Sequence, residues 1–211
     1  MFRRHAFASV ASVILIAMLA PSAAGAVEDG RARVIVADAV EIGARHCAEA
    51  FDDPDKIGAN LSAAGARSVP LDYFSMPGRA DGVVGSYSLE LHGEEFGILV
   101  FPRDGCQVMV QSQAVITANT ELRKLIAGTY SGRCTDAHTQ LNKSRSVLLN
   151  RRFCTLDRAQ EDGRVTVILT LLTLGPDIAF LVTQFTPLEP EGVEEILANQ
   201  SRYFDLDVGI D

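Results

Sequence analysis

The chain has 211 residues and a formal net charge of −8. An acidic chain of this size is repelled by nucleic acid and by anionic lipid, so its charge argues against both as partners. It has no tryptophan, and aromatic residues make up 7% of it, which argues against a surface that stacks on sugars or bases. An enzyme, a binding module and a thiol-redox protein remain as classes.

The first 26 residues have the pattern of a secretory signal peptide. Arg3 and Arg4 precede an uncharged, mostly apolar run at 6–20, which is shorter than the ~20 residues of a membrane-spanning helix. The sequence AGA at 24–26 is a cleavage site of the A-x-A type. We predict export by the general secretory route, cleavage after this site and a mature charge of −10, with no stable membrane insertion. The alternative is an uncleaved membrane anchor.

Helices and a loop are expected before the first strands. Residues 32–51 are predicted to be helical, because apolar residues and Cys47 recur every three or four positions on one stripe. A short helix is expected over 55–64 and a loop over 65–82. Three antiparallel strands separated by turns and then a helix follow, at 86–91, 96–101, 106–111 and 119–127. In the first of these strands Tyr87, Leu89 and Leu91 alternate with serines that are expected to face solvent.

The second half of the chain has a similar outline. Its expected elements, in chain order, are strands at 147–156, 165–172 and 178–185 and a helix that begins at Pro190. The apolar triplet of each half's helix has the same spacing, displaced by 71 residues. The predicted fold is therefore α+β: one domain over 27–211, with two pseudo-repeated three-stranded groups in halves 27–128 and 129–211, and helices packed on one side.

The cysteines predict two disulfides, because an even number in an exported chain is typical of structural bonds. They are Cys47, Cys106, Cys134 and Cys154. Their spacing lacks the close pairs of a metal site, and a nucleophile or redox thiol is the other alternative. Of the three connectivities, we favour Cys47–Cys106 and Cys134–Cys154, because Cys47 is on the inward helix stripe and Cys106 begins a strand after a turn.

The chain has no catalytic motif of a familiar kind: no G-x-S-x-G, H-E-x-x-H, Walker loop or G-x-G-x-x-G. His92 with Glu94 and Glu95 offers metal-ligand chemistry, but a polar hairpin turn explains these residues equally well. Asp136 and His138 offer an acid and a base without a nucleophile beside them. We therefore expect no metal and no cofactor, and we do not favour an enzyme.

Basic residues gather in one stretch of this acidic chain, at Arg133, Lys143, Arg145, Arg151 and Arg152. Arginine side chains suit carboxylates and phosphates, because the guanidinium fork donates two parallel hydrogen bonds. This stretch is the candidate site for an anion or for a protein partner. An edge strand protected by positive charge is the alternative interpretation.

Three segments carry a resemblance: ARHCAEAF, GILVFPRDGCQVMV and RRFCTL. With them the chain resembles small exported proteins of Gram-negative bacteria whose function is not known. The resemblance implies a periplasmic location and disulfides, and it implies no activity.

The preferred hypothesis is a non-enzymatic periplasmic module that binds another envelope protein, as an inhibitor does, or a small anionic ligand. The alternative is a periplasmic hydrolase whose site combines distant residues such as His92, Asp136 and His138.

Overall fold

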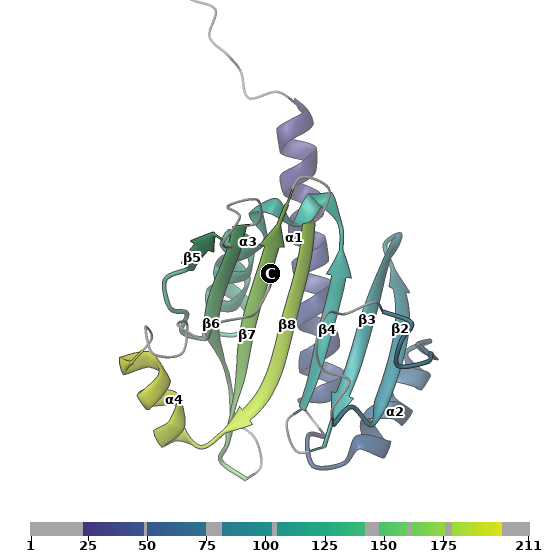
Figure 1. Ribbon diagram of the computed structural model, residues 1–211. Helices are drawn as coiled ribbons and strands as arrows, with labels where there is room; N and C mark the ends of the chain where they lie inside the picture. The colour runs from purple at the N-terminus through teal and green to yellow at the C-terminus, as the bar shows by residue number, and fades with distance from the viewer. Residues whose placement is uncertain are drawn as a thin grey trace, which may run out of the picture.

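The computed structural model describes residues 23–48, 50–74, 82–102, 105–141, 148–159, 162–175 and 179–199 (Figure 1). These residues form an antiparallel sheet of eight strands with four α-helices. The helical elements are α1 (Ala23–Ile42), η1 (Gly43–Cys47), α2 (Pro54–Ala63), η2 (Gln113–Thr117), α3 (Ala118–Thr129) and α4 (Pro190–Ala198). The strands are β1 (Arg67–Ser68), β2 (Gly85–Leu91), β3 (Glu94–Phe101), β4 (Gly105–Gln111), β5 (His138–Leu141), β6 (Leu148–Ala159), β7 (Val165–Leu174) and β8 (Ala179–Leu188).

The sheet joins two groups of three strands in the order β1-β2-β3-β4-β8-β7-β6-β5. Each group is a meander of sequential hairpins, and the two meet where β4 pairs with β8, with Val108 opposite Thr183. The short strands β1 and β5 extend the two edges. The α+β class and the antiparallel pairing are thus as predicted, whereas the sequence pattern did not indicate β1, β5 or η2.

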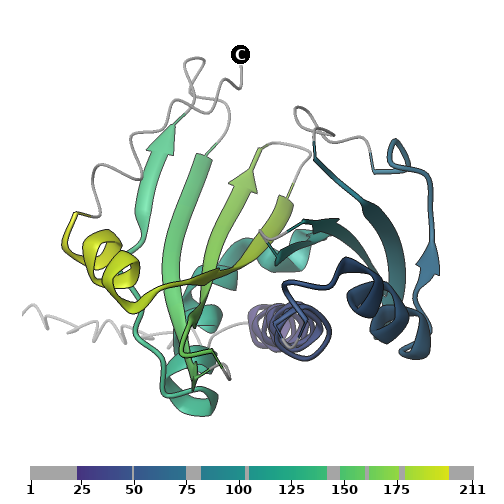
Figure 2. The same ribbon diagram turned by 90° about the horizontal axis from the view of Figure 1, so that it is seen from below.

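Helices α1, α2 and α3 cover one face of the sheet, which we call the helix face (Figure 2). The expected apolar stripe is buried there: Val36, Val40, Cys47 and Phe51 are at most 2% exposed. The helix of this stripe changes at Gly43, where one turn of π-helix begins and Ala48 N–H donates to the Gly43 carbonyl at 2.9 Å. Because this turn is wider than an α-helical turn, Gly43 and Cys47 both lie against the core.

Helix α4 packs against the opposite face of the sheet. Its Val193 joins Phe153 and Val167 in a separate apolar cluster. Their neighbours Cys154 and Ile168 belong to the core on the helix face, and side chains alternate along a strand. The expectation that all helices lie on one side is therefore not confirmed. The pseudo-repeat is not confirmed either, because α3 and α4 follow equivalent strand groups and cover different faces.

The serines of β2 are buried, contrary to the expected solvent-facing side of this strand. Ser86 and Ser88 are each 3% exposed. The Ser88 hydroxyl donates to Glu95 Oε1, which also accepts from Tyr73 Oη and Arg67 Nη2 at 3.0 and 2.9 Å. The prediction was wrong because Tyr73, in the segment after β1, joins Arg67 and Glu95 in a polar network over this face. The alternation within β2 does not reveal that network.

Both predicted disulfides are present. Cys47–Cys106 joins η1 to β4 with the Cα atoms 5.9 Å apart, and Cys134–Cys154 joins the segment before β5 to β6 with the Cα atoms 4.1 Å apart. All four cysteines are used. The connectivity inferred from the helix stripe and the turn before Cys106 is confirmed.

The expected signal segment lies mostly outside the described residues, and α1 already begins at Ala23, upstream of the predicted cleavage site. Within the described part of the chain, none of the helices combines the length and the apolar character needed to cross a bilayer.

Candidate anion-binding site

The structure separates the basic residues that the sequence grouped together. Arg133 is exposed, and its guanidinium pairs with Glu194 of α4. Arg151 and Arg152 are each 6% exposed on β6, and as neighbours on a strand they face opposite sides of the sheet. Lys143 and Arg145 lie outside the described residues. The five therefore do not form one described surface, and of the three that the structure describes, only Arg152 faces α1–α3.

The segment before β5 is held firmly against β6. Thr135 N–H donates to the Phe153 carbonyl and Thr155 N–H to the Arg133 carbonyl, both at 2.8 Å. The Cys134–Cys154 disulfide lies between these two bonds. Gly132 allows the close approach, because a Cβ there would stand 1.7 Å from the Thr155 carbonyl oxygen. This segment thus forms a fixed cover over the β6 edge.

Arg152 lies beneath this cover. Its Nη1 donates to the Thr135 carbonyl at 2.6 Å, while Nε is buried without a hydrogen-bond partner among the described residues. Burial lowers the pKa of the Arg152 guanidinium, the charge of Arg123 lowers it further, and Asp136 acts in the opposite direction. Burial and the like charge of Arg123 therefore indicate a cation that the protein only partly compensates, and Asp136 supplies part of that compensation.

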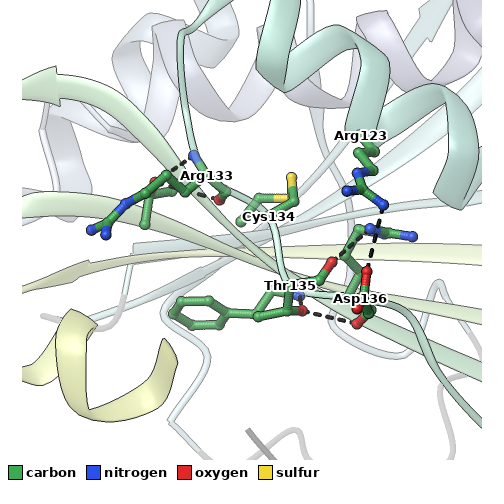
Figure 3. Close-up of a disulfide and its surroundings, with 9 residues drawn as sticks. Arg123, Arg133, Cys134, Thr135 and Asp136 are labelled. Atoms are coloured by element: carbon green, nitrogen blue, oxygen red, sulfur yellow. Dashed lines mark hydrogen bonds and ion pairs between the residues drawn. A yellow bond between two sulfur atoms is a disulfide. The ribbon is translucent and has the colours of Figure 1, made fainter. Parts of the chain in front are cut away.

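Arg123 and Asp136 complete the site (Figure 3). Arg123 extends from α3, and its Nη1 is 3.5 Å from Asp136 Oδ1. The side chain of Arg123 is 58% exposed and that of Asp136 is 92% exposed. Asp136 pairs with Arg123 and acts on Arg152 only through its charge, so one solvated carboxylate faces two guanidiniums and a surplus positive charge remains. This arrangement suits a carboxylate or a phosphate.

Arg151 has a different environment. It is paired by register with His138 of β5 and with Leu171 of β7, on the face that α4 partly covers. Burial lowers the pKa of its guanidinium. Because the sheet lies between Arg151 and Arg152, the two cannot contact one ligand atom together.

The structure does not bring together the residues of the hydrolase alternative. His92 lies in the turn between β2 and β3, where its Nδ1 is 2.7 Å from Asp38 Oδ2. His138 is on β5, at the other end of the strand order, and Asp136 is two residues before it. Five to six strand spacings separate the β2–β3 turn from β5, which corresponds to roughly 24–29 Å.

The turn residues near His92 also diverge. Glu94 is buried on the helix face, where it accepts from Arg31 Nε at 2.8 Å and from Ser112 Oγ at 3.2 Å. Glu95 lies on the opposite face with Arg67. Among the described residues, no three histidine, cysteine, aspartate or glutamate side chains gather in a way that could hold a metal ion.

Sequence reasoning missed Arg123 and the Thr135 carbonyl. Arg123 is an outward residue of an amphipathic helix, where a basic side chain is ordinary, and 28 residues separate it from Arg152. No local pattern connects a helix position to a strand position across that distance.

Comparison with known proteins yields no relative: no family model, no curated protein and no solved structure matches this chain.

Proposed function

We propose that the protein is an exported, non-enzymatic binding module that recognises an anionic group through Arg123 and Arg152. The observation that carries this proposal is the state of Arg152, a guanidinium 6% exposed whose Nε has no partner among the described residues. Its one hydrogen bond within that part of the chain is to a neutral carbonyl. A buried cation of this kind is costly unless an anion compensates it.

The stapled segment supports recognition by a preformed site. The disulfide at Cys134 and the two backbone bonds beside it fix the Thr135 carbonyl, which in turn orients the Arg152 fork. A group that is held before binding loses little conformational entropy when the ligand arrives. Arg123, which is exposed on α3, then supplies the second contact.

We further propose that the module works in the periplasm and that its anion belongs to another envelope protein, as it would in an inhibitor of an envelope enzyme. Two disulfides fit an oxidising compartment. A small anionic ligand presents the same chemistry to the two arginines, so the test must separate the two sources.

The direct test is a titration of the protein with inorganic phosphate and with succinate, followed by backbone amide NMR. The amides of 133–136 and of α3 should shift, and Arg123→Gln should weaken binding by about ten- to a hundredfold, since a charge-assisted hydrogen bond is worth ~1.5–3 kcal/mol. Arg45→Gln is the matched control, because Arg45 is an equally exposed arginine of η1. Equal binding by wild type and Arg123→Gln would refute the site.

The source of the anion is tested by crosslinking in the periplasm followed by mass spectrometry. One dominant partner that is lost in Arg123→Gln and retained in Arg45→Gln would identify a protein ligand. Binding of phosphate or succinate without such a partner would assign a small-molecule ligand.

A further inference from the structure

Most of the buried polar atoms without partners lie on α3 and on the two strands that it contacts, β6 and β7. Six such side-chain atoms occur among the described residues, and Ser86 on β2 accounts for one of them. The other five belong to four residues of α3, β6 and β7: Asn119, Asn150, Arg152 and Thr170. Native proteins satisfy nearly all buried polar groups, so a cluster of exceptions calls for a common explanation.

The strand residues of this cluster lie side by side on the helix face. Asn150, Arg152 and Cys154 are every second residue of β6, so their side chains share one face of the sheet. Cys154 belongs to the core on the helix face, which places all three there. Thr170 is the direct partner of Arg152 across the β6–β7 pair, which puts their Cβ atoms about 5 Å apart. Thr170 is fully buried.

Asn119 lies on the side of α3 that faces β6. It precedes Ile126 by seven residues, or about two helical turns, so the two side chains lie on the same side of α3. Ile126 faces β6, because its Cγ2 and the Thr155 carbonyl oxygen would stand 2.7 and 1.7 Å from a Cβ placed on Gly132. Asn119 is 6% exposed, and neither of its side-chain amide atoms has a partner among the described residues.

Three of the five atoms are donors whose combined chemistry is that of a small anion site, and the other two, Asn119 Oδ1 and Asn150 Oδ1, are acceptors. The unused donors are Arg152 Nε, Thr170 Oγ1 and Asn119 Nδ2, and the Arg152 guanidinium brings a positive charge. Arg152 and Thr170 are 6% and 0% exposed, so this pair of donors is shielded from solvent. A shielded pair of donors suits a monatomic anion better than a carboxylate or a phosphate, which carries two or more oxygens that each need a donor.

We propose that the protein binds one chloride ion beneath α3, held by Arg152, Thr170 and Asn119. The site shares Arg152 with the surface site but does not involve Arg123. Both proposals draw on the uncompensated charge of Arg152, and Arg123→Gln separates them because it changes the surface site alone. The chloride ion compensates the Nε side of the Arg152 guanidinium, which faces Thr170, while the surface ligand contacts the side that faces Arg123.

The first test compares thermal unfolding in sodium chloride and in sodium gluconate at equal ionic strength. The wild type should melt several degrees higher in chloride, because a ligand that binds only the folded state raises its stability. Thr170→Val keeps the side-chain shape and removes the donor, so this chloride-specific shift should disappear. Thr183→Val is the matched control: Thr183 is the neighbour of Thr170 on β8, but its hydroxyl already donates to the Val108 carbonyl at 3.2 Å.

The sign of the Thr170→Val effect is decisive. Without a bound ion, the substitution removes an unsatisfied buried hydroxyl and should raise the melting temperature in both salts. That result, or an equal chloride shift in wild type and Thr170→Val, would overturn the proposal. Crystals soaked in bromide should show an anomalous peak between Arg152 and Thr170, and a soak without that peak would also count against the site. Arg123→Gln should retain the chloride shift whatever its effect on phosphate and succinate.

Discussion

Gly43 lies directly against the ring of Phe185, and a methyl group at position 43 would stand 2.2 Å from Cζ of that ring. Phe185 is fully buried at the centre of the sheet. The turn of π-helix that begins at Gly43 therefore allows α1 to approach the sheet so closely that only a hydrogen atom fits at this position. The same turn carries Cys47 to its disulfide partner.

We expect Gly43→Ala to destabilise the protein by about 1–3 kcal/mol, the usual range for overpacking of a core. Chemical denaturation of the purified protein measures this. Gly30→Ala is the control, because Gly30 is on the same helix and a Cβ there meets nothing within 4 Å. It should leave stability unchanged or raise it by about 0.5–1 kcal/mol through helix propensity. Equal effects of the two substitutions would contradict the close packing on Phe185.

The two disulfides should contribute unequally to stability. Cys47–Cys106 closes a loop with a sequence separation of 59, and Cys134–Cys154 closes one of 20. Loop entropy predicts that replacing the first pair by alanines costs about 4 kcal/mol and the second about 3 kcal/mol. Urea unfolding of the two double variants measures both. A larger loss from the shorter loop would mean that native packing at Cys134, rather than the unfolded chain, dominates its contribution.

Asp136 should compete with the ligand of the surface site. Its carboxylate lies 3.5 Å from Arg123 Nη1 and is almost fully exposed, so it already neutralises part of the positive charge that would attract an incoming anion. Asp136→Asn should therefore strengthen phosphate binding several-fold, measured by calorimetry or by amide NMR. Glu194→Gln is a suitable control, because Glu194 is an exposed carboxylate that pairs with Arg133 instead. Weaker binding by Asp136→Asn would show that the carboxylate is part of the recognition site.

Glu95 should contribute a small pH-dependent stabilisation. Hydrogen bonds from Ser88, then Tyr73 and Arg67, hold the pKa of this carboxyl below its usual value. A carboxyl whose pKa is lower in the folded state stabilises the fold at pH values above its unfolded pKa of about 4.3. The contribution is lost as the pH falls through the folded pKa. Because the side chain is 45% exposed, solvent screening limits the effect to less than about 1 kcal/mol.

This pH dependence is checked by unfolding wild type and Glu95→Gln at a series of pH values. The stability difference between them should be largest near neutral pH and should shrink below pH ~4. Glu90→Gln, at an exposed position of β2, serves as the comparison. A difference that is independent of pH would mean that the network acts through packing alone.

The sequence by itself determined the local elements and the covalent frame. Period-two runs and turn residues predicted six of the strands, and the three-and-four stripe through Val40 and Cys47 predicted a helix that buries that cysteine. These signals are local, because the pleat of a strand and the pitch of a helix dictate which side chains share a face. The disulfide pairing followed from them.

Only the tertiary structure decided how these elements share faces and which charges meet. The packing of α4 on the face opposite α3 and the polar network over Ser88 depend on contacts between segments that are distant in sequence. Arg123 approaches Arg152 because α3 packs over β6, and alternation along β6 turns Arg151 away from both. A sequence records which residues carry charge, but burial and long-range packing decide which of those charges remain uncompensated.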